Sequence, residues 1–174
     1  MSKLLIVVDM QNDFINGSLG TKEAQAIVPN VSEKIKEYTT RGDSIIFTRD
    51  THFSDYLDTQ EGKKLPVTHC IKDTRGWQIT DELKIDNALF VDKNTFGWEH
   101  WRSTFKEYFG MVQFDSIELV GLCTDICVVS NALILKALFP ETEISVDGKC
   151  CAGVTPHSHL AALETMKSCQ INIL

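Results

Sequence analysis

Residues 120–130 read VGLCTDICVVS, and the rest of the chain is best understood around this stretch. The apolar run at 117–120 predicts the end of a buried strand, and the residues from 125 onwards predict a helix, with a tight turn between them. Cys127 is therefore expected in the first turn of that helix. Unpaired backbone N–H groups and the positive end of the helix dipole favour the thiolate there, which is the nucleophilic form of cysteine. The stretch predicts a covalent nucleophile, with a buried structural cysteine as the alternative.

Length and charge narrow the class of protein. At 174 residues, the chain is expected to form a single domain over 1–174. A net charge of −7 argues against nucleic acid or an anionic membrane as a partner, because phosphate binding needs a basic surface. No apolar run reaches the length of a membrane span, and the first residues lack the features of a secretion signal. The six cysteines, without a CxxC pair, are then expected to be reduced thiols of a cytoplasmic protein.

Apolar runs and amphipathic segments alternate along the chain. The expected strands are 4–8, 44–48, 88–91, 116–120, 143–146 and 171–174, and the expected helices are 24–40, 98–109, 125–138 and one that begins at Thr155. Proline is tolerated in a first turn, so the first helix is open to a start at Pro29 instead of Ala24. This alternation predicts an α/β fold, a three-layer α/β/α sandwich around a six-stranded, mostly parallel sheet. Residues 53–77 show little periodicity and predict a long structured loop, which is usually functional.

Polar side chains follow four of the expected strands. Asp9 follows the first strand, Asp50 and His52 follow the second, Lys93 follows the third, and Cys127 follows the fourth by one turn. Because ligands bind at the carboxyl ends of parallel strands, we expect these side chains to lie close together. Each of these residues can also be explained without a catalytic role, as a turn or cap residue or as a solvated lysine. Together, a cysteine, an aspartate and a lysine suggest a nucleophile, a base and an electrostatic helper.

Four segments carry the motifs of a known hydrolase family. They are residues 7–14 (VVDMQNDF), 91–93 (VDK), 121–128 (GLCTDICV) and 147–159 (DGKCCAGVTPHSH). The first resembles a D-x-Q-N-D-F opening motif, the second a strand-plus-lysine segment, the third a G-x-x-T-D-x-C-V nucleophile turn, and the last a closing strand–turn–helix segment. The chain thus resembles the isochorismatase-like cysteine hydrolases along nearly its whole length, and within them the nicotinamidases. The resemblance implies an isochorismatase-like, Rossmann-like fold.

The resemblance also implies a mechanism. It implies a catalytic triad of Asp9, Lys93 and Cys127, and a cis peptide between Leu122 and Cys123. The backbone N–H groups of Cys123 and Cys127 would form an oxyanion hole. Asp9 would take the thiol proton, Lys93 would stabilise the negative charge, and a thioester would form as ammonia leaves. In nicotinamidases the substrate is nicotinamide and the product is nicotinate.

A second set of residues matches the metal ligands of nicotinamidases. Asp50 and His52 match a D-x-H pair, and His69 matches a later histidine, with a backbone-bonded loop histidine as its alternative. Residues two apart on an extended segment point the same way, so the pair can share one ion. A carboxylate with two imidazoles suits a divalent metal, with Zn²⁺ as the first choice and Fe²⁺ or Mn²⁺ as alternatives. The resemblance implies that this metal binds the pyridine nitrogen of the substrate.

A fourth metal ligand is expected on the long loop. Glu61 resembles the further acidic ligand of some nicotinamidases, although it lies one residue further from His69 than the family spacing. Asp55 and Asp58 compete with it for this place.

The substrate pocket is expected to be apolar. Phe14 and Leu19 from the first loop, Leu65 from the long loop, and Phe96 or Trp98 after the third strand would form a slot for the ring. The expected partner is a small-molecule amide, and the resemblance leaves a homo-oligomer open. Two other functions remain alternatives: hydrolysis of a ureidoacrylate, carbamoylsarcosine or maleamate-type amide with the same triad, and a non-catalytic metal-binding scaffold. Isochorismatase itself is disfavoured, because it does not use the cysteine nucleophile.

Overall fold

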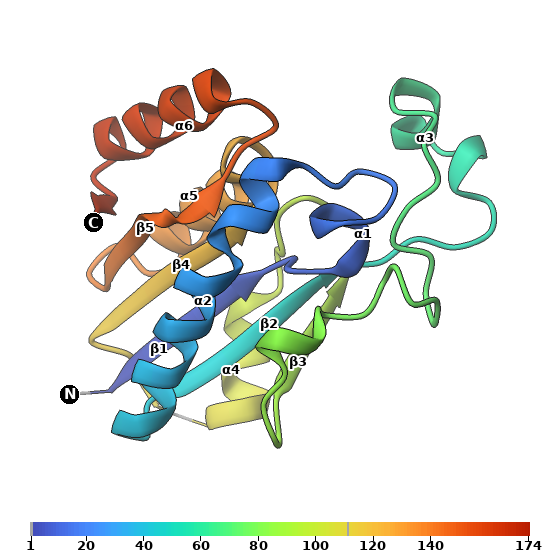
Figure 1. The fold of residues 1–174 in the computed structure, drawn as a ribbon. Helices are drawn as coiled ribbons and strands as arrows, with labels where there is room; N and C mark the ends of the chain where they lie inside the picture. Colours follow the sequence, from blue (N-terminus) through green and yellow to red (C-terminus); the bar gives the residue numbers. More distant parts are fainter. Residues whose placement is uncertain (1, 111) are drawn as a thin grey trace.

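A computed structural model describes residues 2–110 and 112–174 (Figure 1). Six strands form one sheet in the order β3-β2-β1-β4-β5-β6, and each strand is parallel to its neighbours. The strands are β1 (Lys3–Val8), β2 (Ser44–Asp50), β3 (Leu89–Lys93), β4 (Ser116–Leu122), β5 (Glu143–Ala152) and β6 (Asn172–Ile173). The predicted α/β fold with a six-stranded parallel sheet is confirmed.

Helices cover both faces of the sheet (Figure 1). They are α1 (Asn12–Ile15), α2 (Lys22–Arg41), α3 (Gln60–Lys64), α4 (Trp101–Phe109), α5 (Val129–Leu138) and α6 (Pro156–Ser168). In β1, Leu4, Ile6 and Val8 pack in one core cluster with residues of α4, α5 and α6, while Leu5 and Val7 pack in another with α2. This alternation is the period-two geometry of a strand buried on both faces. In the described ranges, none of the helices combines the length and apolar character that crossing a membrane requires.

Helix α2 begins earlier than the sequence predicts. Its first residue is Lys22, and the Thr21 side chain caps it by accepting a hydrogen bond from the Ala24 N–H at 3.0 Å. Pro29 therefore lies inside the helix, where a proline costs about 3 kcal/mol. The buried face that runs along the whole helix comprises Ala24, Ile27, Val31, Ile35 and Tyr38. Burying its larger side chains stabilises by about 1.5–3 kcal/mol each, which outweighs the cost of the proline.

Strand β5 ends later than predicted, at Ala152 instead of Val146. Its pairing with β4 shifts between Leu119 and Gly121, because Val146 lies opposite Leu119 whereas Cys151 lies opposite Gly121. Residues 147–150 thus form an irregular stretch within the strand, and Asp147, Gly148 and Lys149 conceal the strand pattern in the sequence. Because of these added residues, β5 ends at the same edge of the sheet as β4.

The chain between β2 and β3 makes a long excursion at the carboxyl edge of the sheet (Figure 1). It contains α3 and two 3₁₀ turns, Tyr56–Asp58 and Asp81–Leu83. Two isolated bridges hold it to the sheet edge, one between His52 and Ile71 and the other between Gln11 and Ile79. This segment is the structured loop that the sequence predicts.

Candidate active site

Three side chains meet at the carboxyl edge of β1, β3 and β4. The Lys93 Nζ atom lies 2.7 Å from Asp9 Oδ2 and 3.6 Å from the Cys127 sulfur. The exposed fractions of Asp9, Lys93 and Cys127 are 0%, 1% and 5%. Two opposite charges beside a thiol in a dry environment are suited to moving a proton. The structure brings the three residues together, and their catalytic roles stay predictions.

Asp9 is held where the chain turns away from β1. Its backbone has a left-handed φ of 49°, and the Thr48 hydroxyl donates a hydrogen bond to Asp9 Oδ1 at 2.6 Å. Burial raises the pKa of Asp9, while Lys93 acts in the opposite direction. The raised pKa makes this carboxylate a better proton acceptor. Sequence reasoning missed Thr48, for which the only signal was a hydroxyl directly after the apolar run at 45–47.

Lys93 is the last residue of β3 and links the thiol to a second group of polar residues. Burial alone would lower the pKa of its ammonium group, but Asp9, Cys127 and Asp50 raise it above the usual value. The side chain therefore remains charged. Its Nζ atom also donates to the Thr95 carbonyl at 3.1 Å and lies 4.0 Å from Asp50 Oδ1.

The turn that carries Cys127 differs from the predicted helix start. β4 ends at Leu122, and the Leu122–Cys123 peptide is cis, as the family resemblance implies. A π-helical turn, Thr124–Val128, follows before α5 begins. Gly121 has a φ of 118°, and a Cβ atom there would lie 2.1 Å from the Val8 carbonyl oxygen. Only glycine therefore allows β4 to approach β1 so closely just before the turn.

Burial works against the thiolate form of Cys127 that the helix end was expected to favour. Burial raises its pKa well above the usual value, Lys93 offsets only part of this, and Asp9 raises it further. The effect of the helix end is smaller than the cost of placing a charge in this dry environment. A thiolate therefore requires transfer of the proton to a neighbouring base.

Asn131, one helical turn after Cys127, is another residue that sequence reasoning missed. Its Nδ2 group donates to the carbonyls of Cys127 at 2.8 Å and Phe96 at 3.2 Å. Its Oδ1 atom accepts from the Trp98 N–H at 2.9 Å and the Trp101 indole at 3.0 Å. This fully buried amide thus ties the Cys127 turn to the segment that follows Lys93. A lone asparagine in an apolar helix was its only signal.

Two residues of the T-D motif fix the other side of the same turn. The Thr124 hydroxyl lies 2.7 Å from His159 Nδ1, and Asp125 Oδ1 accepts from the Val154 N–H at 3.1 Å. Because Val154 and His159 come from the end of β5 and the start of α6, these bonds hold the closing segment against the Cys127 turn.

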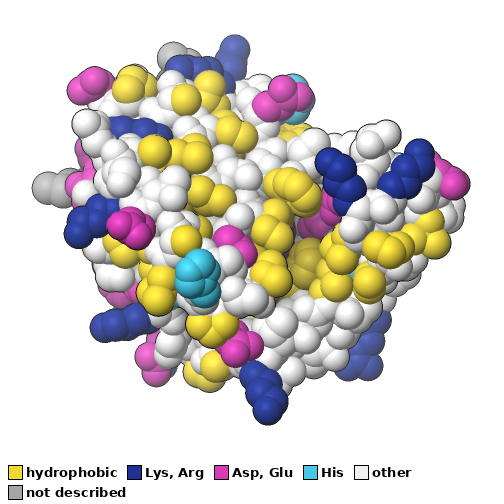
Figure 2. All heavy atoms as spheres, turned by 90° about the horizontal axis from the view of Figure 1, so that it is seen from above, with side chains coloured by type: hydrophobic (Ala, Val, Ile, Leu, Met, Phe, Trp, Pro, Cys, Tyr) yellow, Lys and Arg dark blue, Asp and Glu magenta, His cyan; other side chains and the backbone are white. Residues whose placement is uncertain are grey.

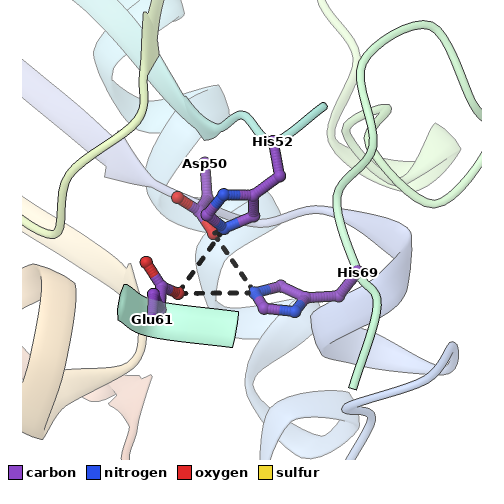
Figure 3. A group of neighbouring side chains, drawn as sticks. All are labelled: Asp50, His52, Glu61 and His69. Atoms are coloured by element: carbon purple, nitrogen blue, oxygen red, sulfur yellow. Dashed lines mark hydrogen bonds and ion pairs between the residues drawn. The ribbon is translucent and has the colours of Figure 1, made fainter. Parts of the chain in front are cut away.

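Asp50, His52, Glu61 and His69 form a second cluster, drawn in Figure 3. Their donor atoms all lie within 4.8 Å of one another. The His52 Nε2 atom lies 2.9 Å from Asp50 Oδ2 and 3.5 Å from Glu61 Oε1, and the His69 Nε2 atom lies 3.5 Å and 3.9 Å from the same oxygens. Four ligands around one Zn²⁺ ion are about 3.4 Å apart. The cluster therefore fits a single divalent metal ion.

Hydrogen bonds around His69 and Asp50 favour the forms of these side chains that can bind a metal ion. The His69 Nδ1 atom contacts the Val67 carbonyl at 2.7 Å, and its Nε2 atom faces the cluster (Figure 3). Such a bond fixes the tautomer that a metal-ligating histidine needs. Although burial would raise the pKa of Asp50, hydrogen bonds with His52 and His69 lower it. The carboxylate is thus ionised, as a metal ligand must be.

Glu61 completes the cluster, and its two competitors do not. It lies in the first turn of α3, which Thr59 caps by accepting a hydrogen bond from the Gly62 N–H at 3.0 Å. Asp55 and Asp58 are exposed and lie outside the four-residue group.

A cavity of about 280 Å³ opens beside both groups, and apolar side chains gather around it in Figure 2. Its lining includes Phe14, Leu19, Leu65 and Phe96 of the predicted pocket, together with Thr21, Ala24, Leu122, Cys123, Ile126, Cys127, Gly153, Val154, Asp50, Glu61 and His69. Trp98, the predicted alternative to Phe96, is not part of it. The Trp98 indole packs against the core and donates to the Thr104 hydroxyl at 2.9 Å. No Lys or Arg is found among these lining residues of the described chain.

A sheet edge that gathers a buried acid, an ammonium group and a thiol beside a four-ligand cluster is the arrangement of a hydrolase site. Residues 3–174 match the model of the isochorismatase domain, and the chain belongs to that family. The nicotinamidase of Saccharomyces cerevisiae is 25% identical over 99% of both chains. The pyrazinamidase of Pyrococcus horikoshii, solved in complex with zinc, is 28% identical over 100% of this chain and 99% of that chain, with a TM-score of 0.84. The nicotinamidase/pyrazinamidase of Bacillus subtilis is 26% identical over 99% of both, with a TM-score of 0.85.

Proposed function

We propose that this protein is a nicotinamidase-type amidohydrolase that converts nicotinamide to nicotinate and ammonia through a cysteine thioester. The observation that carries this proposal is the shared cavity, which the Cys127 thiol and the Asp50, Glu61 and His69 side chains all line. A small amide inside it can place its carboxamide at the sulfur and its ring toward the cluster. The relatives named nicotinamidase support the same substrate.

In the proposed reaction, Asp9 takes the thiol proton and the Cys127 sulfur attacks the carboxamide carbon. Lys93 stabilises the negative charge that develops beside it. The tetrahedral oxyanion is held by the backbone N–H groups of Cys123 and Cys127, and removing one such donor typically costs about 10²–10³ in rate. Asp9 then gives its proton to the departing ammonia as the C–N bond breaks. A water, activated by Asp9, attacks the thioester, breaks the C–S bond and restores the thiol.

Asp50, His52, Glu61 and His69 would hold one divalent cation. Zn²⁺ is the proposed ion, supported by the ligand separations and by the zinc complex of the Pyrococcus pyrazinamidase, with Fe²⁺ and Mn²⁺ as alternatives. When bound, such an ion would supply a positive charge, and an aromatic nitrogen or water would join the four side chains as a further ligand. The apolar side chains that line the cavity would orient the ring.

The charge of the cavity favours a neutral aromatic amide over an amide that carries a carboxylate. Asp50 and Glu61 balance the charge of the proposed cation, and the lining residues of the described chain contribute no Lys or Arg to pair with a substrate carboxylate. Phe14, Leu65 and Phe96 give the walls an apolar surface. Maleamate, ureidoacrylate and carbamoylsarcosine each bear such a charge, and burying it unpaired costs several kcal/mol.

An ammonia-release assay over a panel of amides tests the proposed function. We expect kcat/KM for nicotinamide to exceed that for maleamate and N-carbamoylsarcosine by at least about 100-fold, because an unpaired buried charge costs about 3 kcal/mol or more. Benzamide, which has the same ring without the nitrogen, is the matched control for ring recognition. A preference for any carboxylate-bearing amide would reject the nicotinamidase proposal and support the alternative class.

Removal of the metal is expected to lower kcat/KM for nicotinamide by about ten-fold or more, because losing a metal contact typically costs that much or more. The measurement is the same assay after dialysis against a chelator, with metal content verified, followed by readdition of Zn²⁺. Recovery of the rate on readdition of Zn²⁺ is the control against irreversible unfolding during dialysis. An unchanged nicotinamide rate in verified metal-free protein would contradict the anchoring role.

A further inference from the structure

Residues 11–13, the Q-N-D part of the opening motif, all contact the long loop between β2 and β3. Gln11 is fully buried, and its Nε2 group donates to the carbonyls of Asp50 and Trp77, each at 2.8 Å. Its Oε1 atom accepts from the Asp50 N–H at 2.7 Å. Gln11 thus binds both backbone groups of one residue in the metal cluster without taking part in the cluster itself.

Asp13 makes the corresponding contact on the far side of the loop. Its Oδ2 atom accepts a hydrogen bond from the Cys70 N–H at 2.8 Å, and its own N–H donates to the Gly76 carbonyl at 3.0 Å. Next to it, Asn12 donates from Nδ2 to the Arg75 carbonyl at 2.8 Å. Figure 1 shows α1, which contains Asn12 and Asp13, lying against the excursion that these bonds hold.

The backbone of Cys70 can affect the geometry of the metal cluster, because Cys70 directly follows His69, one of the two histidines of the cluster. Cys70 has a left-handed φ of 47°, so the chain turns sharply just after His69. The Cys70 carbonyl accepts from the His52 N–H at 3.0 Å, and the His52 carbonyl accepts from the Lys72 N–H at 2.9 Å. The Asp13 carboxylate therefore fixes the one residue that lies between the backbones of both cluster histidines.

We propose that Asp13 is a positioning residue that sets the metal affinity of this site through the Cys70 N–H. Asp13 belongs to the sheet-edge segment that also provides Asp9, so it fixes the distance between the loop and the sheet. Without it, the Cys70 N–H would lose its hydrogen bond, and the backbone next to His69 would lose its direct tie to α1. The inference rests on the metal site of the proposed function, but its test measures metal binding directly.

Asp13→Ala and Asp13→Asn test the role of the hydrogen bond. The probe is Zn²⁺ alone, titrated into metal-free protein in competition with a chromophoric chelator. We expect Asp13→Ala to weaken Zn²⁺ binding by about ten-fold or more, as for other outer ligand partners. Asp13→Asn keeps an oxygen that can accept from the Cys70 N–H, so it should retain most of the affinity. Amide hydrogen exchange in residues 69–72 should become faster in Asp13→Ala and stay near the wild-type rate in Asp13→Asn.

A second variant leaves Asp13 itself intact. A Cβ atom at Gly76 would lie 2.1 Å from Asp13 Oδ2 and 2.3 Å from its Cγ atom, so Gly76→Ala must displace the carboxylate. We expect weaker Zn²⁺ binding of the same order as in Asp13→Ala. Asp58→Ala is the matched control, because Asp58 is an exposed acid of the same loop outside the cluster, and its affinity should stay unchanged.

The outcomes separate this inference from the proposed function. Wild-type Zn²⁺ affinity and exchange rates in both Asp13→Ala and Gly76→Ala would overturn the positioning role, whatever the substrate. Equal losses in Asp13→Asn and Asp13→Ala would also overturn it, because the charge rather than the hydrogen bond would then set the affinity. Weakened Zn²⁺ binding that Asp13→Asn restores would support it, even if nicotinamide proved not to be the substrate.

Discussion

Cys127→Ala is expected to lower ammonia release from nicotinamide by at least about 10⁴-fold while the protein stays folded. The sulfur forms the bond to the substrate in the proposed reaction, and no other group can replace it there. The fold should tolerate the change, because removing one sulfur atom from this site opens only a small cavity. We expect a loss of stability of about 1 kcal/mol.

The measurement combines the ammonia assay with urea unfolding and with alkylation of the purified protein. Cys169→Ala is the matched control, since Cys169 is a free and exposed cysteine far from the cavity lining, and it should keep wild-type activity. In the wild-type protein, nicotinamide should protect Cys127 from iodoacetamide. Turnover by Cys127→Ala close to that of the wild type would end the thioester mechanism.

Lys93→Met should abolish activity and also lower the free energy of unfolding by about 3–5 kcal/mol. Lys93 and Asp9 form a buried ion pair with 2.7 Å between Nζ and Oδ2, and both side chains have no exposed surface. Methionine has a similar shape but no charge. Asp9 would then keep its hydrogen bond from Thr48 but lose its counter-ion, so a lone charge would remain in a dry environment.

A double variant separates the charge from the shape. Asp9→Asn combined with Lys93→Met removes both charges, and we expect it to recover most of the lost stability while staying inactive. Chemical unfolding monitored by circular dichroism measures both effects. Lys84→Met, at a half-exposed lysine paired with Asp81, is the control and should cost less than about 1 kcal/mol. Wild-type stability in Lys93→Met, or no recovery in the double variant, would contradict this account of the pair.

The six parallel strands and the two covered faces of the sheet could be anticipated because most of the strands are short apolar runs followed by polar residues. Two element boundaries, the start of α2 and the end of β5, could not be anticipated. Pro29 suggested a helix start, but the apolar stripe of α2 continues on both sides of it, and tertiary packing overrides the local preference. Asp147, Gly148 and Lys149 hid the second half of β5, because an irregular strand breaks the alternation on which the prediction depends.

The meeting of Asp9, Lys93 and Cys127 could be expected from their positions after separate strands. The direction in which the pKa of the Cys127 thiol shifts could not be expected, because it depends on how much water the fold excludes. Thr48 and Asn131 were equally hidden. Their importance lies in which carbonyl, amide or carboxylate each one reaches, and neither spacing nor composition carries that information.

Two parts of the chain form the site: the carboxyl edge of the sheet and the excursion between β2 and β3. In the proposed reaction the sheet edge would supply the atoms that make and break bonds, whereas α3 and the segment at His69 would supply two of the four metal ligands, and Leu65 lines the cavity. Ring recognition can therefore diverge, in evolution or by grafting a new loop, with the amide-cleaving apparatus inherited unaltered. A scaffold arranged in this way is a natural starting point for redirecting an amidase to new rings.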